Sequence, residues 1–384
     1  MRRITPALFL TYLCYQIILL IISSKASYRV IGLMSGTSLD GLDIACCTLD
    51  FIDGNWAYSI LKASTITYNK RWMQKLKTAH LLPAYELLKL HNEYGTFIGK
   101  SVYDFVKAQG LKHIDLVASH GHTVFHNPAD GITFQLGSGA AIQAACGIAV
   151  ASDFRTLDVM LGGQGAPLIP VCDMLLFPQY GFCLNLGGFA NISYNNAEGN
   201  RLAFDICPVN IALNHYAGLL NMEYDRNGEA AASATVNNSL LARLNKLGYY
   251  KQRPPKSLGR EWLEETFLPL TENSAIPIQA KLATLTEHAA RQIAAALNAR
   301  PASECLVTGG GAHNKYLIRK IREKTKVRLV IPPDDVVNFK EALGFALLGV
   351  LRLRGEVNCL KSVTGSRHNS SGGTLYSAGR GEIS

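Results

Sequence analysis

The chain has 384 residues, too many for one ordinary hydrophobic core, and this length predicts two domains with short additions. Almost half of the residues (48%) are apolar and 17% are charged, which excludes a largely disordered protein. The formal net charge is +9, but the basic residues are spread along the sequence and form no stripe with interleaved aromatic residues. We therefore expect a phosphorylated small molecule as ligand, and no nucleic acid.

The first 27 residues form an apolar leader. Arg2 and Arg3 precede an apolar run from residue 7 to 22, and Ser24, Lys25 and Ala26 follow it. This pattern is typical of a signal peptide or a short membrane anchor, but a misassigned upstream start would give the same pattern. The nine cysteines show no Cys-x-x-Cys or metal-finger spacing, which indicates free thiols in a reducing compartment.

The next segment predicts a strand hairpin, helices and a further strand. Apolar strands are expected at 29–33 and 42–49 around a glycine and serine turn, helices between 70 and 110, and a buried strand at 114–119. A short apolar run at 148–151 predicts one more strand.

A second cycle repeats this plan. Strands are expected at 183–186 and 190–194 around Gly187 and Gly188, helices near 210, at 236–247 and at 278–298, and a strand at 304–308 before Gly309. Two such cycles predict a two-lobed α/β fold with a ligand cleft between the lobes.

Three glycine turns that follow buried strands are suited to nucleotide phosphates, because their backbone amides can point at an anion. Purely structural hairpins of this kind are common, so one turn alone is a weak signal. Three turns fit a nucleotide held from two lobes, whereas a Rossmann or P-loop protein would show a single fingerprint. The expected nucleotide-binding residues are Gly36, Thr37, Ser38, Leu39, Asp40, Gly41, Leu42, Asp43, Gly187, Gly188, Gly309, Gly310, Gly311 and Asn314.

Eight ordered segments resemble the motifs of the anhydro-N-acetylmuramic acid kinases, over about residues 28–365. They are Gly32–Gly41, Ser119–His126, Asp153–Arg155, Gly162–Pro167, the hairpin at 185–193, Phe204-Asp205 with Pro208 and Asn210, Lys256-Ser257 with Gly259–Glu261, and Gly309–Gly311. The resemblance implies two RNase H-like lobes of the actin, hexokinase and Hsp70 type with an interdomain cleft. We expect lobe I at 28–152, rejoined by 343–366, lobe II at 153–342, and a flexible tail at 367–384.

The resemblance also implies the reaction, in which 1,6-anhydro-N-acetylmuramic acid, ATP and water give N-acetylmuramic acid 6-phosphate and ADP during cell-wall recycling. Opening the anhydro bridge needs a base that activates water, and Asp205 matches the family's catalytic aspartate. The alternative role for Asp205 is to cap the helix expected near Asn210. Mg²⁺ is expected with ATP, although the sequence does not identify its ligands.

The resemblance places further residues at the sugar: His120, His122, Asp153, Arg155, Gln164, Asn210 and Glu341. Arg155 could pair with the lactyl carboxylate of the substrate or form a surface ion pair with Asp153. Three nearby histidines, His120, His122 and His126, could suggest a metal site, but no carboxylate or cysteine joins them locally.

The chain departs from the commoner family form at His122 (glutamine), Ile206-Cys207 (threonine-glycine) and Leu258 (threonine). Two alternatives therefore remain, a kinase for another amino sugar or hexose, and a non-catalytic muropeptide-binding protein. An ATP-dependent reaction predicts a cytoplasmic protein, with export or anchoring as the alternative if the leader is retained. A homodimer is one expected assembly.

Overall fold

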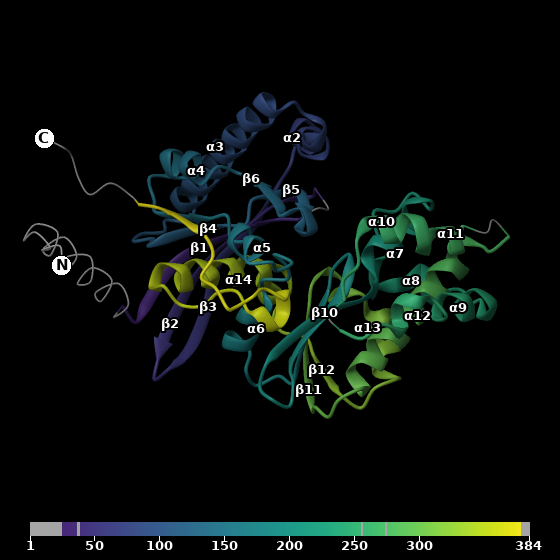
Figure 1. Cartoon of the computed structure of the whole chain (residues 1–384). Helices are drawn as coiled ribbons and strands as arrows, with labels where there is room; N and C mark the ends of the chain where they lie inside the picture. The colour runs from purple at the N-terminus through teal and green to yellow at the C-terminus, as the bar shows by residue number, and fades with distance from the viewer. Residues whose placement is uncertain (1–24, 37–38, 255, 273–274, 378–384) are drawn as a thin grey trace, which may run out of the picture. The chain divides into compact units, whose positions relative to one another are not determined.

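The computed structural model describes residues 25–36, 39–254, 256–272 and 275–377, and these form two compact units. Unit 1 combines the chain up to Leu176 with the chain from Glu341 onward, and unit 2 is the continuous segment Phe177–Lys340. Figure 1 shows the two units coloured along the chain. In the described part of the chain, no helix is long and apolar enough to cross a membrane.

Unit 1 is built on a six-stranded sheet with the order β13-β7-β4-β1-β2-β3. Strands β1, β2 and β3 are antiparallel neighbours, whereas β4 runs parallel to both β1 and β7. The bounds are β1 (Ser27–Ser35), β2 (Gly41–Ile52), β3 (Asn55–Thr67), β4 (Leu116–Ser119), β7 (Val150–Ser152) and β13 (Thr374–Tyr376), with β5 (His122–Asn127) and β6 (Ile132–Leu136) as a separate hairpin.

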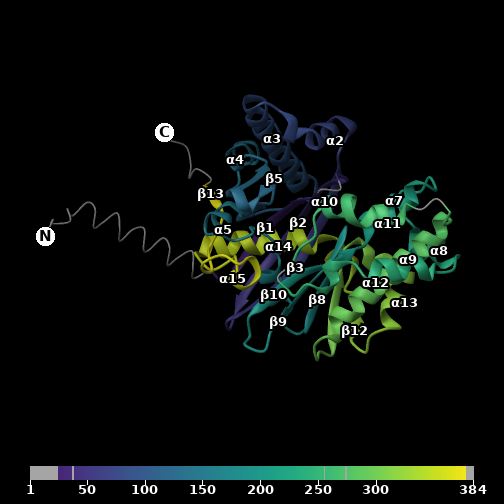
Figure 2. The ribbon, with the colours of Figure 1, turned by 45° about the vertical axis from the view of Figure 1, so that its right-hand side comes forward.

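Helices cover both faces of this sheet. Ile31 and Leu33 of β1 pack into a core with α3 (Ala84–Ala108) and α4 (Gly139–Cys146), and the residue between them, Gly32, faces the other way. A Cβ on Gly32 would meet the carbonyl of Ala342, so glycine there allows α14 (Asp334–Arg354) to lie directly on the sheet (Figure 1, Figure 2). The remaining helices are α2 (Lys70–Lys77), α5 (Thr156–Met160), α6 (Pro170–Leu176) and α15 (Lys361–Thr364).

Unit 2 is built on a five-stranded sheet with the order β10-β9-β8-β11-β12. Strands β8, β9 and β10 are antiparallel neighbours, and β11 runs parallel to β8 and β12, so the order and directions repeat those of β3-β2-β1-β4-β7. The bounds are β8 (Phe182–Leu186), β9 (Phe189–Asn195), β10 (Arg201–Pro208), β11 (Glu304–Thr308) and β12 (Arg328–Val330). The predicted duplication and the two RNase H-like lobes are therefore confirmed.

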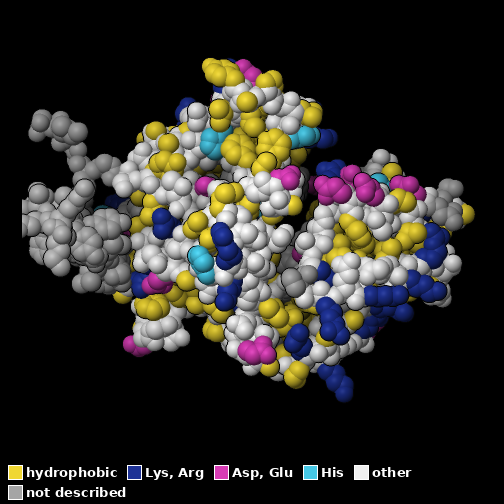
Figure 3. Space-filling view, viewed as in Figure 1, with side chains coloured by type: hydrophobic (Ala, Val, Ile, Leu, Met, Phe, Trp, Pro, Cys, Tyr) yellow, Lys and Arg dark blue, Asp and Glu magenta, His cyan; other side chains and the backbone are white. Residues whose placement is uncertain are grey.

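A single core cluster joins the sheet of unit 2 to its helices, with β-strand residues such as Leu184 and Ile192 packed against Ile293 and Leu317. The helices are α7 (Asn210–Gly218), α8 (Glu229–Ala232), α9 (Asn238–Asn245), α10 (Arg260–Trp262), α11 (Leu268–Thr271), α12 (Ile278–Asn298) and α13 (Lys315–Arg322). Figure 3 shows dark-blue lysine and arginine side chains gathered over the α13 region, where Lys315, Arg319, Lys320 and Arg322 lie.

The structure corrects one of the two expected boundaries between the units. The first crossing between units lies at Leu176 and not at 152, because the segment after β7 packs within unit 1: Asp158 accepts a hydrogen bond from Thr364 and Cys172 donates one to the carbonyl of Gly344. The second crossing, at Lys340, is close to the expected residue 342.

The expected flexible tail is also wrong for its first part. Residues 374–376 form β13, which pairs antiparallel with β7, and the loop before it is fixed by Asn358, whose side chain bonds both the N–H and the carbonyl of Gly372. The rest of the predicted tail, 378–384, and most of the predicted leader lie outside the described residues.

Candidate active site

The first glycine turn joins β1 to β2 in unit 1. Ser35 pairs with Leu42, and Leu39 adopts a left-handed φ of 62° inside the turn. Gly41 lies against the backbone of Ile66, where a Cβ would come within 2.7 Å of the carbonyl oxygen. Gly41 therefore allows the start of β2 to pack closely against β3, while Thr37 and Ser38 lie outside the described residues.

Asp43 lies in β2, directly after this turn. Burial, opposed by a hydrogen bond of 2.5 Å from the Thr65 hydroxyl and helped by the negative charges of Asp40 and Glu341, raises the pKa of Asp43 to about 6. Glu341 comes from α14, so the end of the chain supplies a carboxylate to the turn at its beginning.

Arg155 is held by neutral partners. Its Nε and Nη2 atoms lie 3.0 and 2.9 Å from Nε2 of His120, and Nη1 donates to the carbonyl of Gly165 at 2.5 Å. No carboxylate lies within ion-pair distance of Arg155 among the residues described, so the expected alternative of an ion pair with Asp153 is wrong. Asp153 instead accepts a hydrogen bond from Thr156.

The acceptor role of Nε2 places the proton of neutral His120 on Nδ1. Burial and the positive charge of Arg155 hold the pKa of His120 well below its usual value, so the ring is neutral. Nδ1 is buried and makes no hydrogen bond within the described part of the chain. This buried N–H is therefore a candidate donor to a bound molecule.

The Gly162–Pro167 segment is positioned by Asp158, a residue that the sequence analysis missed. Asp158 is fully buried and accepts hydrogen bonds from the N–H of Gly165, the thiol of Cys359 and the hydroxyl of Thr364. Gln164 is exposed beside it, with its N–H bonded to the carbonyl of Thr364. The sequence offers one signal for Asp158, a carboxylate within an apolar stretch. Such a residue is as common in ordinary helices as in functional sites.

His122 begins β5 and is bonded through Nδ1 to the Ser35 hydroxyl at 3.2 Å. Burial lowers its pKa to about 4. Among the described residues, no group of three or more histidines, cysteines, aspartates or glutamates is arranged to hold a metal ion.

The second and third glycine turns meet in unit 2. Asn210, at the start of α7, donates from Nδ2 to the carbonyl of Leu186, and a Cβ on Gly311 would come within 2.7 Å of the Leu186 side chain. Gly309 has a φ of 82° and lies against Asn185. The structure thus brings Asn210 to the predicted nucleotide turns of its own unit.

Asn314, which is predicted to bind the nucleotide, has a structural role in the described fold. Its side-chain oxygen accepts from the N–H of Leu317 at 3.0 Å and caps the N-terminus of α13. The predicted glycine turn before a helix is therefore present.

Asp205 lies in β10, next to a bulge in its pairing with β9. Its Oδ2 atom accepts from the N–H of Leu258 at 2.9 Å, and Oδ1 accepts no hydrogen bond from any residue that the structure describes. Burial raises its pKa to about 6. The helix cap near Asn210 is Val209 and has no side-chain bond, so the capping alternative for Asp205 is wrong.

Two residues that the sequence analysis did not assign to Asp205 hold its backbone. The Tyr249 hydroxyl donates to the Asp205 carbonyl at 2.5 Å, and the Asp205 N–H donates to the carbonyl of Lys256 at 3.2 Å. The Lys256 ammonium lies 4.5 Å from the centre of the Tyr249 ring. The backbone around the carboxylate is therefore fixed from the 249–258 segment.

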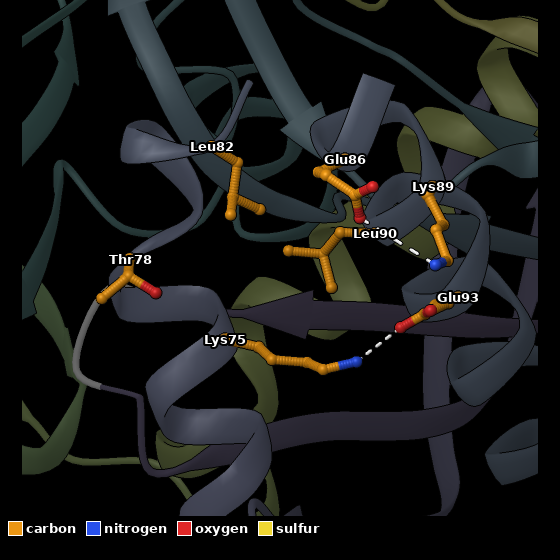
Figure 4. A pocket seen from close by; sticks show the side chains of 7 residues that line it. All are labelled: Lys75, Thr78, Leu82, Glu86, Lys89, Leu90 and Glu93. Carbon is orange, nitrogen blue, oxygen red and sulfur yellow. Dashed lines mark hydrogen bonds and ion pairs between the residues drawn. The ribbon is translucent and has the colours of Figure 1, made fainter. Parts of the chain in front are cut away.

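A surface hollow between α2 and α3 of unit 1 contains none of the predicted residues (Figure 4). Its charged side chains pair within the hollow itself, Lys75 with Glu93 and Lys89 with Glu86. It offers no uncompensated charge to a ligand.

A model of the anhydro-N-acetylmuramic acid kinase family matches residues 28–378. The chain belongs to this family. The relative named anhydro-N-acetylmuramic acid kinase from Gloeobacter violaceus is 34% identical, covering 91% of this chain and 98% of the relative, and that from Francisella tularensis subsp. novicida is 33% identical, covering 88% and 95%. Among solved structures, the activator of the 2-hydroxyisocaproyl-CoA dehydratase from Clostridium difficile is 13% identical, covering 85% of this chain and 96% of that chain, with a TM-score of 0.41.

Proposed function

We propose that this member of the anhydro-N-acetylmuramic acid kinase family uses ATP and water to convert 1,6-anhydro-N-acetylmuramic acid into N-acetylmuramic acid 6-phosphate and ADP. The observation that carries the proposal is Asp205, a carboxylate with one oxygen fixed by the Leu258 N–H and the other without a partner among the described residues. A pKa of about 6 leaves it mostly ionised at neutral pH while keeping it basic enough to accept a proton.

In the proposed reaction, Asp205 takes a proton from water as the water oxygen bonds to the anomeric carbon. The bond between that carbon and the bridge oxygen O6 breaks, and O6 takes the γ-phosphoryl group of ATP as ADP leaves. Atoms balance, since one water and one ATP give the phosphorylated open sugar and ADP, and the proton returns to solvent. Positioning and charge neutralisation supply most of the catalysis of such a transfer.

Arg155 is proposed to bind the lactyl carboxylate of the sugar. Its three described hydrogen bonds use three of the five guanidinium N–H groups, and the two that remain suit a carboxylate. The buried Nδ1–H of His120 is a second proposed donor to the sugar. Asp153 and Gln164 are proposed to lie beside the sugar.

ATP is proposed to bind with Mg²⁺ at the predicted glycine turns. No protein ligand is assigned to the metal, because the described residues include no group of three or more carboxylates, histidines or cysteines arranged to hold one. When bound, Mg²⁺ would neutralise phosphate charge. The need for ATP leads us to propose a cytoplasmic location, and the homodimer stays a prediction that sedimentation velocity can test.

The deciding experiment incubates the protein with ATP, Mg²⁺ and the anhydro-sugar and identifies the products by mass spectrometry and ³¹P NMR. We expect the sugar 6-phosphate from the wild type and a loss of at least about a hundredfold in kcat for Asp205→Asn, because the base is removed. Asp334→Asn, an exposed aspartate of the same unit, is the matched control and should keep full activity. Equal activity of Asp205→Asn and the wild type would refute the assigned role.

Other substrates in this assay test the first alternative, and calorimetry tests the second. A kinase for another sugar would phosphorylate N-acetylmuramic acid or glucose in preference to the anhydro-sugar, with Asp205 deprotonating an existing hydroxyl. A non-catalytic muropeptide-binding protein would bind the sugar in calorimetry without binding ATP.

A further inference from the structure

A chain of buried polar groups runs through unit 1 from α3 to β5. It consists of Tyr94, Tyr68, Ser35 and His122, each at most 4% exposed. The Tyr94 and Tyr68 hydroxyl oxygens are 2.5 Å apart, the Tyr68 hydroxyl donates to Ser35 at 2.8 Å, and Ser35 lies 3.2 Å from Nδ1 of His122. Ser35 is the last residue of β1, directly before the glycine turn.

The positions of the protons in this series of hydrogen-bonded groups can be assigned by counting donors. Each hydroxyl has one proton. Tyr68 gives its proton to Ser35, so the short contact between the tyrosines requires Tyr94 to donate to Tyr68. Ser35 already accepts, and its own proton needs an acceptor in this buried site, where an orphan hydroxyl is costly. The acceptor within reach is Nδ1 of His122.

The ring of His122 then has a defined tautomer. Burial keeps the imidazole neutral, so it carries a single ring proton, and with Nδ1 accepting from Ser35 that proton is on Nε2. Nε2 makes no hydrogen bond within the described residues, and it is not one of their buried polar atoms without a partner, so it reaches the surface. The site is the end of β1 and β4, where the parallel strands of this sheet finish and where ligands of α/β folds bind.

We propose that Tyr94 and Tyr68 act through Ser35 as positioning residues that hold His122 as its Nε2–H tautomer, so that it offers a fixed N–H donor to an oxygen acceptor of the sugar. The identity of the ligand rests on the proposed function, whereas the tautomer of His122 does not. The opposite tautomer would point a lone pair at the same place and repel an oxygen acceptor. Discrimination would then come from the direction of one hydrogen bond.

The first test is ¹⁵N NMR of the full chain with ¹⁵N-labelled histidine, in which His122→Gln identifies the His122 signals. We expect a pyrrole-type Nε2 and a pyridine-type Nδ1 in the wild type. In Tyr68→Phe/Tyr94→Phe, Ser35 loses the hydrogen bond that it accepts from Tyr68 and becomes free to accept from Nδ1–H, so a mixed tautomer signal is expected. Tyr85→Phe, an exposed tyrosine of α3, is the control and should leave the signal unchanged. A pyrrole-type Nδ1 in the wild type would overturn the proposal.

The second test separates positioning from folding. His122→Ala should raise the KM for the sugar by roughly tenfold with kcat and the KM for ATP nearly unchanged, since one ground-state hydrogen bond is lost. His122→Gln, whose amide also offers N–H, should restore most of the affinity. Equal KM values for the alanine and glutamine variants would contradict the donor role. If no variant, nor the wild type, turns over the anhydro-sugar, the proposed function fails while the NMR result still decides the tautomer.

Discussion

Asp205 is a carboxyl group that the folded protein holds in an environment unfavourable to its charge. Its ordinary pKa of 3.8 rises to about 6 through burial, and the hydrogen bond from the Leu258 N–H offsets only part of this rise. The sequence could supply the residue, because the Phe204-Asp205 motif is recognisable. It could not supply the environment, because Tyr249, Lys256 and Leu258 reach Asp205 from a segment about fifty residues away.

The raised pKa predicts that Asp205→Asn stabilises the protein at neutral pH. The folded state binds the proton of Asp205 more tightly than the unfolded state, so this group contributes stability below pH 3.8 and loses it as the pH rises through about 6. The two-unit difference sets an upper limit of about 3 kcal/mol, and partial exposure reduces the expected gain to about 1 to 2 kcal/mol at pH 7.5. Scanning calorimetry should show a higher Tm for the variant at pH 7.5 and little difference at pH 4, and a Tm lowered equally at both would contradict this.

At the scale of elements, the hairpins and long helices were predictable, and the pairing of distant segments was not. The strands at 29–33 and 304–308 and the helix at 278–298 are confirmed, since apolar periodicity is a local property. Strand β3 was missed because most of its side chains are exposed or half-buried and give no apolar run. Strand β13 was missed because its three residues pair with β7 across more than two hundred positions.

Gly309 in the third glycine turn and Gly199 in the turn between β9 and β10 provide a matched pair of substitutions. Gly309 and Gly199 have φ values of 82° and 80°, so alanine at either position strains the backbone. Only at Gly309 would a new Cβ also come within 2.5 Å of the Asn185 side chain, whereas Gly199 has open space. We expect Gly199→Ala to cost about 1 kcal/mol of the free energy of unfolding and Gly309→Ala about 1 to 3 kcal/mol more, with a raised KM for ATP. Denaturant titration measures the free energy of unfolding of each variant. Equal costs for the two variants would argue against a packed turn.

The C-terminal strand predicts that truncation will destabilise unit 1. A chain ending at Ser366 loses β13, exposes the edge of β7, and leaves Arg352 and Asn358 without the carbonyls of Gly373 and Gly372. A chain ending at Ser377 is the reference, because it keeps every described residue. We expect the shorter chain to melt lower by several degrees or to aggregate, and equal melting temperatures would restore the interpretation of this segment as a flexible tail.

At the scale of the whole molecule, the chain contains the same five-strand topology twice, once in each unit. Unit 2 is one continuous segment, whereas unit 1 is completed by a second piece of the chain that adds β13 and most of α14. Unit 2 runs from Phe177 to Lys340 and has its own sheet and one continuous core cluster, so we expect a fragment with these bounds to fold alone. The fragment should extend to residue 340, because the N–H of Gly309 donates to the carbonyl of Val337 and His313 is hydrogen-bonded to Asn338. A fragment ending at residue 330 lacks both partners and is the comparison.

Circular dichroism and thermal melting should show cooperative unfolding for 177–340 and a lower, broader transition for 177–330. The reciprocal protein, in which residues 1–176 are joined directly to 341–384, tests whether unit 1 also folds once its two pieces are connected. Its sheet needs both pieces, because β13 borders β7 and α14 lies on Gly32 of β1. If 177–340 remains unfolded, the two repeats depend on each other for stability, and duplication of topology in this chain does not imply two independent folding units.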